Sequence, residues 1–287
     1  MRNPLLAVLL LVVSLPASTT AVADSATLPD KLRVCSDPNN LPFSHKDGSG
    51  LENKIAQTLA DSMGLELEYT WFPQRMGFIN NTLKSWSDED GRFLCDLVIG
   101  VPAGFDMSAT IAPYYRSVYT FVYKKGGNLD KVKTATDLLN LPQEIKTSLR
   151  IGAFAPSPSI DWLRRHEMFD NTRTYRIMSG DPDYYPGKII EEELINGDLD
   201  LVFIWGPIAG YFAMKNPEAD IVVVPLESEP GIKFDFAMTM GVRYGEKDWQ
   251  QLVQQHVEKS RDKIQAILNE YQVPQLEIGP PPADDDD

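Results

Sequence analysis

The sequence predicts an α/β protein with two lobes, each built from a mostly parallel sheet flanked by helices. Segments with strand-like and helix-like patterns alternate through the first third of the chain, and the alternation restarts after Gly127. Such alternation is typical of parallel strands that are connected by helices. The chain has 287 residues, of which 43% are hydrophobic, so it is long and apolar enough for two domains or one large one.

The first lobe is predicted to alternate between strands and helices. Leu51, Ile55, Leu59 and Met63 fall on one helical face, and the glycine that follows is a plausible helix end. The run "FLCDLVIG" is continuously apolar, as expected for a strand buried on both faces. The expected elements are a strand at 32–36, a helix at 51–63, a strand at 65–71, a helix at 75–86 and strands at 93–100 and 115–124.

The second half of the chain repeats this alternation and ends in helices. Its predicted elements are strands at 148–154, 174–180, 199–205, 219–226 and 236–243, helices at 160–168, 188–196 and 207–215, and a helical region at 247–271. An acidic, disordered tail is expected at 273–287. Ligands of open α/β sheets bind beyond the carboxyl ends of the strands, so two facing lobes would form a ligand cleft there.

Residues 1–23 have the three parts of a secretory signal peptide. Arg2 supplies a positive charge, residues 5–15 are apolar, and residues 21–23 form a small-x-small cleavage site. The apolar part is too short for a membrane-spanning helix, which needs about 20 apolar residues. We therefore expect cleavage before Asp24 and export of a soluble protein without membrane insertion.

The chain is acidic, with a formal net charge of −14. Nucleic-acid partners are disfavoured, because phosphate contacts require Lys and Arg side chains. A basic partner protein would be attracted, although the same charge also promotes solubility.

Six motifs, in order along the chain, resemble the periplasmic solute-binding proteins of the polar amino acid type. They are "LRVCSDPNNLPFS", "LENKIAQTLADSMGLELEYTWFP", "CDLVIG", "APYYRSVYTFVYKKG", "DLDLVFIWGPIAGYFAMKNP" and "FAMTMGVRYGEKDW". The resemblance implies a type II periplasmic binding protein fold, with two lobes hinged by two crossovers. It also implies lobe limits: 31–124 plus 233–272 for the first lobe and 127–226 for the second.

Four strings resemble a narrower group, the solute-binding-like proteins that accompany quinoprotein methanol and alcohol dehydrogenases. They are "VCSDPNNLPFS", "YTWFPQRMGFINNTL", "CDLVIGVPAGFDM" and "APYYRSVYTFVYK". This resemblance implies a periplasmic accessory protein of one-carbon metabolism that binds a dehydrogenase, or its cofactor, for maturation or activation. The cytochrome c of the dehydrogenase is a further candidate partner. The dehydrogenase would carry pyrroloquinoline quinone (PQQ) and calcium or a lanthanide. The alternative is a substrate-binding protein that delivers a small non-amino-acid solute to an ABC transporter.

Three positions depart from the amino-acid-binding members of the family. The loop 101–108 has no Arg for a ligand carboxylate, and Trp205 stands where an Asp usually holds the ligand ammonium. Pro156 and Pro158 remove two N–H donors from the start of the helix that normally binds the carboxylate. An unpaired buried polar group costs about 2–7 kcal/mol, so we expect the cleft to exclude ordinary amino acids.

The loops that follow the strands supply the expected cleft residues. The composition of this set suits a planar small molecule or a peptide loop, and Arg75 is a candidate contact for an anion. The alternative is that the aromatic side chains only pack the lobes and that Arg75 is solvated. The set is Asn39, Asn40, Phe43, Trp71, Arg75, Phe105, Met107, Ser157, Ser159, Tyr184, Tyr185 and Trp205.

No motif for catalysis or metal binding is present in the sequence. His45, His166 and His256 are isolated, and neither HExxH nor GxSxG occurs. The acidic runs at 87–90 and 284–287 lack the spacing of an EF-hand. We therefore expect no catalytic residue, no metal ligand and no cofactor in this chain, although enzymes occur among relatives of this fold.

The two cysteines, Cys35 and Cys95, lead to opposing expectations. An oxidising compartment favours a disulfide between them. If Cys95 begins its strand while Cys35 lies near the end of a neighbouring one, they differ by about four residues in register. At about 3.3 Å per residue, this exceeds the roughly 7 Å that a disulfide can span. The register argument weighs slightly more, which disfavours the bridge.

Overall fold

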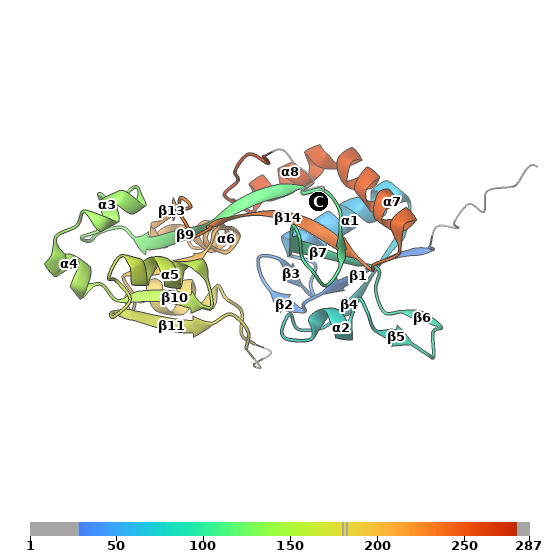
Figure 1. The fold of residues 1–287 in the computed structure, drawn as a ribbon, viewed down its shortest axis with the longest axis horizontal. Coiled ribbons are helices and arrows are strands. Elements are labelled where there is room, and N and C mark those ends of the chain that lie inside the picture. Colours follow the sequence, from blue (N-terminus) through green and yellow to red (C-terminus); the bar gives the residue numbers. More distant parts are fainter. Residues whose placement is uncertain (1–28, 180, 182, 280–287) are drawn as a thin grey trace, which may run out of the picture.

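One continuous sheet runs through both lobes of the molecule (Figure 1). The computed structural model describes residues 29–179, 181 and 183–279, so the predicted signal peptide and the terminal acidic run lie outside the described residues. The sheet has ten strands in the order β11-β10-β12-β9-β14-β7-β1-β4, and β13 and β8 pair with β9 and β14. The predicted α/β fold with two lobes is confirmed.

Parallel strands β7 (Leu97–Pro102), β1 (Lys31–Ser36) and β4 (Glu66–Trp71) lie side by side in the first lobe, with β4 at the edge of the sheet. Helix α1 (Leu51–Met63) buries Leu51, Ile55 and Leu59, as its 3.6-residue periodicity predicts. It ends at Gly64 in the left-handed conformation, with φ 72°, which glycine adopts without strain. Helices α7 (Lys247–Lys259) and α8 (Arg261–Glu270) pack on α1.

The helix predicted at 75–86 is wrong over most of its length. Only α2 (Phe78–Asn81) is helical there, because Gly77 takes a positive φ of 88° and Trp86 already pairs with Phe93 in a small hairpin. The strand predicted from Phe93 begins only at Leu97. The short strands of this lobe are β2 (Asn39–Asn40), β3 (Ser44–His45), β5 (Trp86–Ser87), β6 (Arg92–Phe93) and β8 (Ala109–Thr110).

In the second lobe, β10 (Ile151–Ala155) lies between β11 (Thr172–Arg176) and β12 (Leu201–Trp205), all parallel. Its core includes Phe121, Trp162 and Phe203, each at most 1% exposed. The remaining elements are α3 (Ala135–Leu139), α4 (Gln143–Ser148), α5 (Pro158–Arg165), the π-helix η1 (Ile189–Leu194), α6 (Gly206–Lys215), η2 (Pro217–Ala219) and β13 (Ile221–Pro225).

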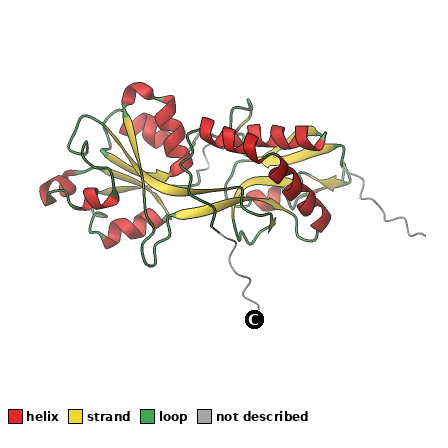
Figure 2. Cartoon of the chain, turned by 90° about the horizontal axis from the view of Figure 1, so that it is seen from above, coloured by secondary structure: helices red, strands yellow, loops and turns green. Residues whose placement is uncertain are grey.

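Two antiparallel strands, β9 (Tyr115–Lys124) and β14 (Asp235–Val242), lead from one lobe into the other. Val118 of β9 pairs with Asp235 of β14, whereas the next residue, Tyr119, pairs with Trp205 of β12. The strand therefore changes lobe between residues 118 and 119. Figure 2 shows these long strands passing between two groups of helices.

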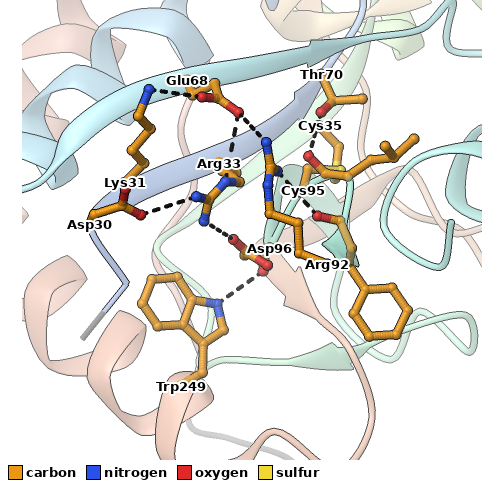
Figure 3. Close-up of polar contacts among 12 residues, drawn as sticks. Asp30, Lys31, Arg33, Cys35, Glu68, Thr70, Arg92, Cys95, Asp96 and Trp249 are labelled. Carbon is orange, nitrogen blue, oxygen red and sulfur yellow. Dashed lines mark hydrogen bonds and ion pairs between the residues drawn. A yellow bond between two sulfur atoms is a disulfide. The ribbon is translucent and has the colours of Figure 1, made fainter. Parts of the chain in front are cut away.

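Cys35 and Cys95 form a disulfide, with 5.4 Å between their Cα atoms, so the expectation against the bridge is wrong. Cys95 does not begin β7 but precedes it, in a segment that crosses the face of β1 toward β4. Thr70 Oγ1 donates to Leu94 O at 2.6 Å, and Thr70 is the partner of Cys35 in the β1–β4 pair (Figure 3). Counting residues along a straight strand therefore overestimated the separation.

Candidate functional site

Two adjoining cavities lie between the lobes and together form what we call the interlobe cleft. The larger has a volume of about 440 Å³ and the smaller about 70 Å³. Both are lined by Asn40 and Gln74 from the first lobe and by Ile177, Met178 and Pro186 from the second. The larger cavity is also lined by Phe43, Pro102, Tyr119, Trp205, Ile208, Phe236 and Met238.

The loop that follows β1 forms the first-lobe wall of the cleft. The two carboxylate oxygens of Asp37 accept hydrogen bonds from the backbone N–H of Asn39 at 2.8 Å and of Gln74 at 2.5 Å. The Asn40 side-chain amide donates to Gln74 Oε1 at 2.7 Å. Asp37 and Asn40 therefore join the loops after β1 and β4, which fixes this wall.

Three aromatic rings from adjacent strands form the base of the cleft, where the chain crosses between the lobes. The Tyr119 ring centroid lies 5.1 Å from that of Trp205 and 6.2 Å from that of Phe236, and the last two lie 6.0 Å apart. These tilted and edge-to-face arrangements are the favoured ones for aromatic pairs. The rings come from β9, β12 and β14, so both lobes share this base.

Two polar groups at this base lack a hydrogen-bond partner within the part of the chain that the structure describes. They are the Tyr119 hydroxyl and the Trp205 indole N–H. Burial raises the pKa of Tyr119, so its hydroxyl stays protonated at neutral pH. Trp offers a donor and Tyr a donor and an acceptor, so the base can bind a neutral ligand that carries a hydrogen-bond acceptor.

Charged side chains occur in the smaller cavity and not among the described lining of the larger one. Asp37, Arg75 and Asp181 line the smaller cavity. The Arg75 guanidinium lies 5.8 Å from the ring centroid of Phe72. The larger cavity therefore suits an apolar or aromatic group, with charged groups available beside it.

Six of the residues expected from the sequence line the cleft: Asn39, Asn40, Phe43, Arg75, Tyr184 and Trp205. Four others pack elsewhere. Trp71 stacks on Tyr69 at 4.5 Å, Tyr185 stacks on Phe212, and Phe105 and Met107 pack against the apolar cluster around the disulfide.

The two serines also lie apart from the cleft lining. Ser157 Oγ donates to Phe154 O at 2.5 Å and belongs to a separate surface cavity. Ser159 is fully buried.

Sequence reasoning missed several lining residues, chiefly those on the two crossing strands. Phe234, Phe236 and Met238 alternate along the chain, and the last two reach the larger cavity. This period-two pattern was available in the sequence. The position of Tyr119 could not be read from the sequence, because it depends on where β9 changes its partner strand.

Within residues 29–179, 181 and 183–279, no three His, Cys, Asp or Glu side chains gather into a potential metal site. None of the helices in these ranges is long and apolar enough to cross a membrane.

Comparison with known proteins decides the family. No family model matches the chain. The periplasmic binding protein XoxJ from Methylobacterium extorquens AM1 is 33% identical, over 86% of this chain and 100% of the XoxJ chain, with a TM-score of 0.67. The chain belongs to the MoxJ/XoxJ family of periplasmic binding proteins.

Two further MoxJ/XoxJ relatives support the same family. MxaJ from Methlophaga aminisulfidivorans MPT is 25% identical, over 86% of this chain and 100% of the MxaJ chain, with a TM-score of 0.70. Protein MoxJ of Methylorubrum extorquens is 29% identical over 274 residues, which are 90% of this chain and 87% of that protein. The resemblance inferred from the sequence motifs is confirmed.

In this MoxJ/XoxJ member, the positions that grip an amino acid in the wider family have other contacts. Trp205 joins the aromatic base, and the loop after β7 turns Phe105 and Met107 toward the disulfide cluster. Helix α5 begins with Pro158, and the Ser157 hydroxyl donates to a backbone carbonyl. None of these positions places a charged side chain in the described lining of the larger cavity.

Proposed function

We propose that this chain is a periplasmic accessory protein of a PQQ-dependent methanol or alcohol dehydrogenase. In this role it binds the dehydrogenase, or its cofactor, through the interlobe cleft and supports maturation or activation without catalysing a reaction itself. Membership of the MoxJ/XoxJ family supports a role in a methanol dehydrogenase system, and the signal-peptide pattern supports a periplasmic location.

The main support for this proposal is the lining of the larger cavity. Its described lining has no Lys, Arg, Asp or Glu, so it offers nothing to balance the two charges of an amino acid. Trp205, Tyr119 and Phe236 instead provide an aromatic surface, and buried aromatic residues dominate protein–protein recognition sites. An apolar or aromatic side chain on a loop of the dehydrogenase would fit this surface.

A second candidate is delivery of a small neutral solute to an ABC transporter. The cavity volume of about 440 Å³ favours it, because small-molecule sites are typically about 300–1,000 Å³. Tight binding of one metabolite, with closure of the lobes, would support this alternative. A permease and an ATPase encoded beside the gene would do so too, whereas a dehydrogenase and a cytochrome there would support the accessory role.

The accessory role is tested by reconstitution. Apo-dehydrogenase from the same organism is incubated with PQQ and calcium or a lanthanide, with and without the purified chain. We expect faster or more complete recovery of dehydrogenase activity when the chain is present, and a loss of activity in cells that lack its gene. Equal recovery in vitro together with intact activity in the deletion strain would rule out the role.

The cleft is tested in the same assay with a matched pair of variants. Trp205→Ala removes an aromatic side chain of the base, whereas Trp86→Ala removes one that is 53% exposed on the β5–β6 hairpin. Loss of the stimulating effect in the first variant alone supports binding through the cleft. Equal loss in both variants, or in neither, contradicts it.

A further inference from the structure

The chain continues past α8 and crosses the hinge on its way to the C-terminus (Figure 1). The sequence assigns residues 273–279 to a disordered tail, yet these residues lie against the hinge strands. Val273 is 6% exposed, and hydrogen bonds with Ser49, Leu268, Arg116 and Ser117 hold residues 271–277. We call residues 271–277 the C-terminal strap.

One end of the strap is fixed to the first lobe. The Tyr271 hydroxyl donates to Ser49 O, just before α1, at 2.5 Å. Lys54 Nζ of α1 lies 5.2 Å from the Tyr271 ring centroid. Val273 N also donates to Leu268 O in α8 at 3.0 Å. The strap therefore begins as a part of the helical layer of this lobe.

The same segment packs on α6, which belongs to the second lobe. The Tyr271 ring stacks on Tyr211 of α6, with centroids 5.5 Å apart and planes 12° apart. A Cβ on Gly210 would lie 2.0 Å from Gln272 O, and one on Gly206 would lie 3.2 Å from Pro274 Cγ. Glycine at position 210 thus permits direct contact between the helix and the strap backbone.

The strap also binds the crossing strand β9 itself. Ser117 Oγ donates to Pro274 O at 2.5 Å, and Leu276 N donates to Arg116 O at 2.9 Å. Arg116 Nη1 donates to Glu277 O at 3.2 Å, while Nε of the same guanidinium donates to Asp235 Oδ2 of β14 at 2.9 Å. One side chain therefore links the strap to both crossing strands.

Closure of a two-lobed protein needs changes in backbone angle where the strands cross. A segment that contacts both lobes and β9, and that Arg116 links to β14, must lose some of these contacts when the lobes rotate. We propose that the C-terminal strap holds the lobes at a nearly fixed angle, so that the cleft stays open instead of closing on its ligand. This conformational restraint is independent of which partner or solute enters the cleft.

The first test displaces the strap in the full chain. Gly210→Ala adds a methyl group where Gln272 O lies, and alanine is otherwise favoured inside a helix. Gly127→Ala is the matched control, because its Cβ would meet nothing within 4 Å and its φ is not positive. Spin labels on Gln57→Cys in α1 and Asp161→Cys in α5, both exposed, report the interlobe distance by pulsed electron resonance. The native cysteines are in a disulfide and do not compete for the label.

The second test removes residues 273–277 of the strap. A chain that ends at Gln272 lacks the contacts with Ser117 and Arg116, whereas one that ends at Glu277 keeps them. We expect a narrow distance distribution in the parent chain and in both controls. We expect a broader or shifted distance distribution in Gly210→Ala, in the chain that ends at Gln272, or in both. If the distributions of both variants match those of their controls, the strap does not restrain the lobes and the proposal fails.

Discussion

Arg116 of β9 and Asp235 of β14 form an ion pair between the two strands that carry the chain from lobe to lobe. Nε and Nη2 of the guanidinium donate to the same carboxylate oxygen, at 2.9 and 2.5 Å. The side chains are 33% and 14% exposed, so water screens the pair only in part. The pair therefore cross-links the two strands next to the point where β9 changes its partner strand.

Arg116→Gln is expected to destabilise the fold by about 1–3 kcal/mol, because a partly buried carboxylate loses its charge-assisted hydrogen bonds. Urea unfolding at neutral pH measures the change. Lys125→Gln is the control, since Lys125 and Asp220 are exposed and 3.8 Å apart, and such surface pairs contribute about 0–1 kcal/mol. If the two substitutions lower the free energy of unfolding equally, the pair between Arg116 and Asp235 is no more important than a surface pair.

The disulfide is expected to stabilise the first lobe. Cys35 and Cys95 are 60 residues apart, and a loop of this size corresponds to about 4 kcal/mol of chain entropy. The double variant Cys35→Ser, Cys95→Ser should therefore unfold at a clearly lower urea concentration than the parent chain. Mass spectrometry with and without reductant checks the bond itself, and an unchanged mass after reduction and unfolding would show that it does not form.

Glu52 is expected to make stability depend on pH. Burial raises the pKa of its carboxyl group to about 8, and the negative charge of Asp37 adds to this effect. Its other titratable neighbours are Tyr69, Tyr114 and Tyr115, whose pKa values are all raised. The folded state therefore keeps a proton that the unfolded state releases above about pH 4.5.

The direction in which stability changes with pH follows from this difference in proton binding. The stabilisation is complete below about pH 4.5 and is lost as the pH rises through about 8, by an amount on the order of a few kcal/mol. Glu52→Gln should flatten this dependence when urea midpoints are compared between pH 5.5 and 8.5. Glu89→Gln, at an exposed position, should leave it unchanged. If the stability of the Glu52→Gln chain depends on pH as that of the parent does, Glu52 is not the source of the pH dependence.

The sequence predicts those parts of the molecule that are governed by periodicity and by strand ends. Helix α1 and its end at Gly64 follow from apolar spacing, and Trp205 reaches the cleft because it ends β12. The disulfide was missed because its register depends on a bend before β7. The strap was missed because residues 273–279 have no apolar repeat, and their order comes from contacts with distant strands.

In the proposed role, the aromatic base of the interlobe cleft binds the partner dehydrogenase. Calorimetric titration of the apo-dehydrogenase with the parent chain, Trp205→Ala and Trp86→Ala measures it directly, after thermal unfolding has shown that all three are folded. We expect Trp205→Ala to weaken binding by at least tenfold, as truncation of a buried aromatic anchor does, and Trp86→Ala to bind like the parent. Parent-like affinity of Trp205→Ala would contradict the claim.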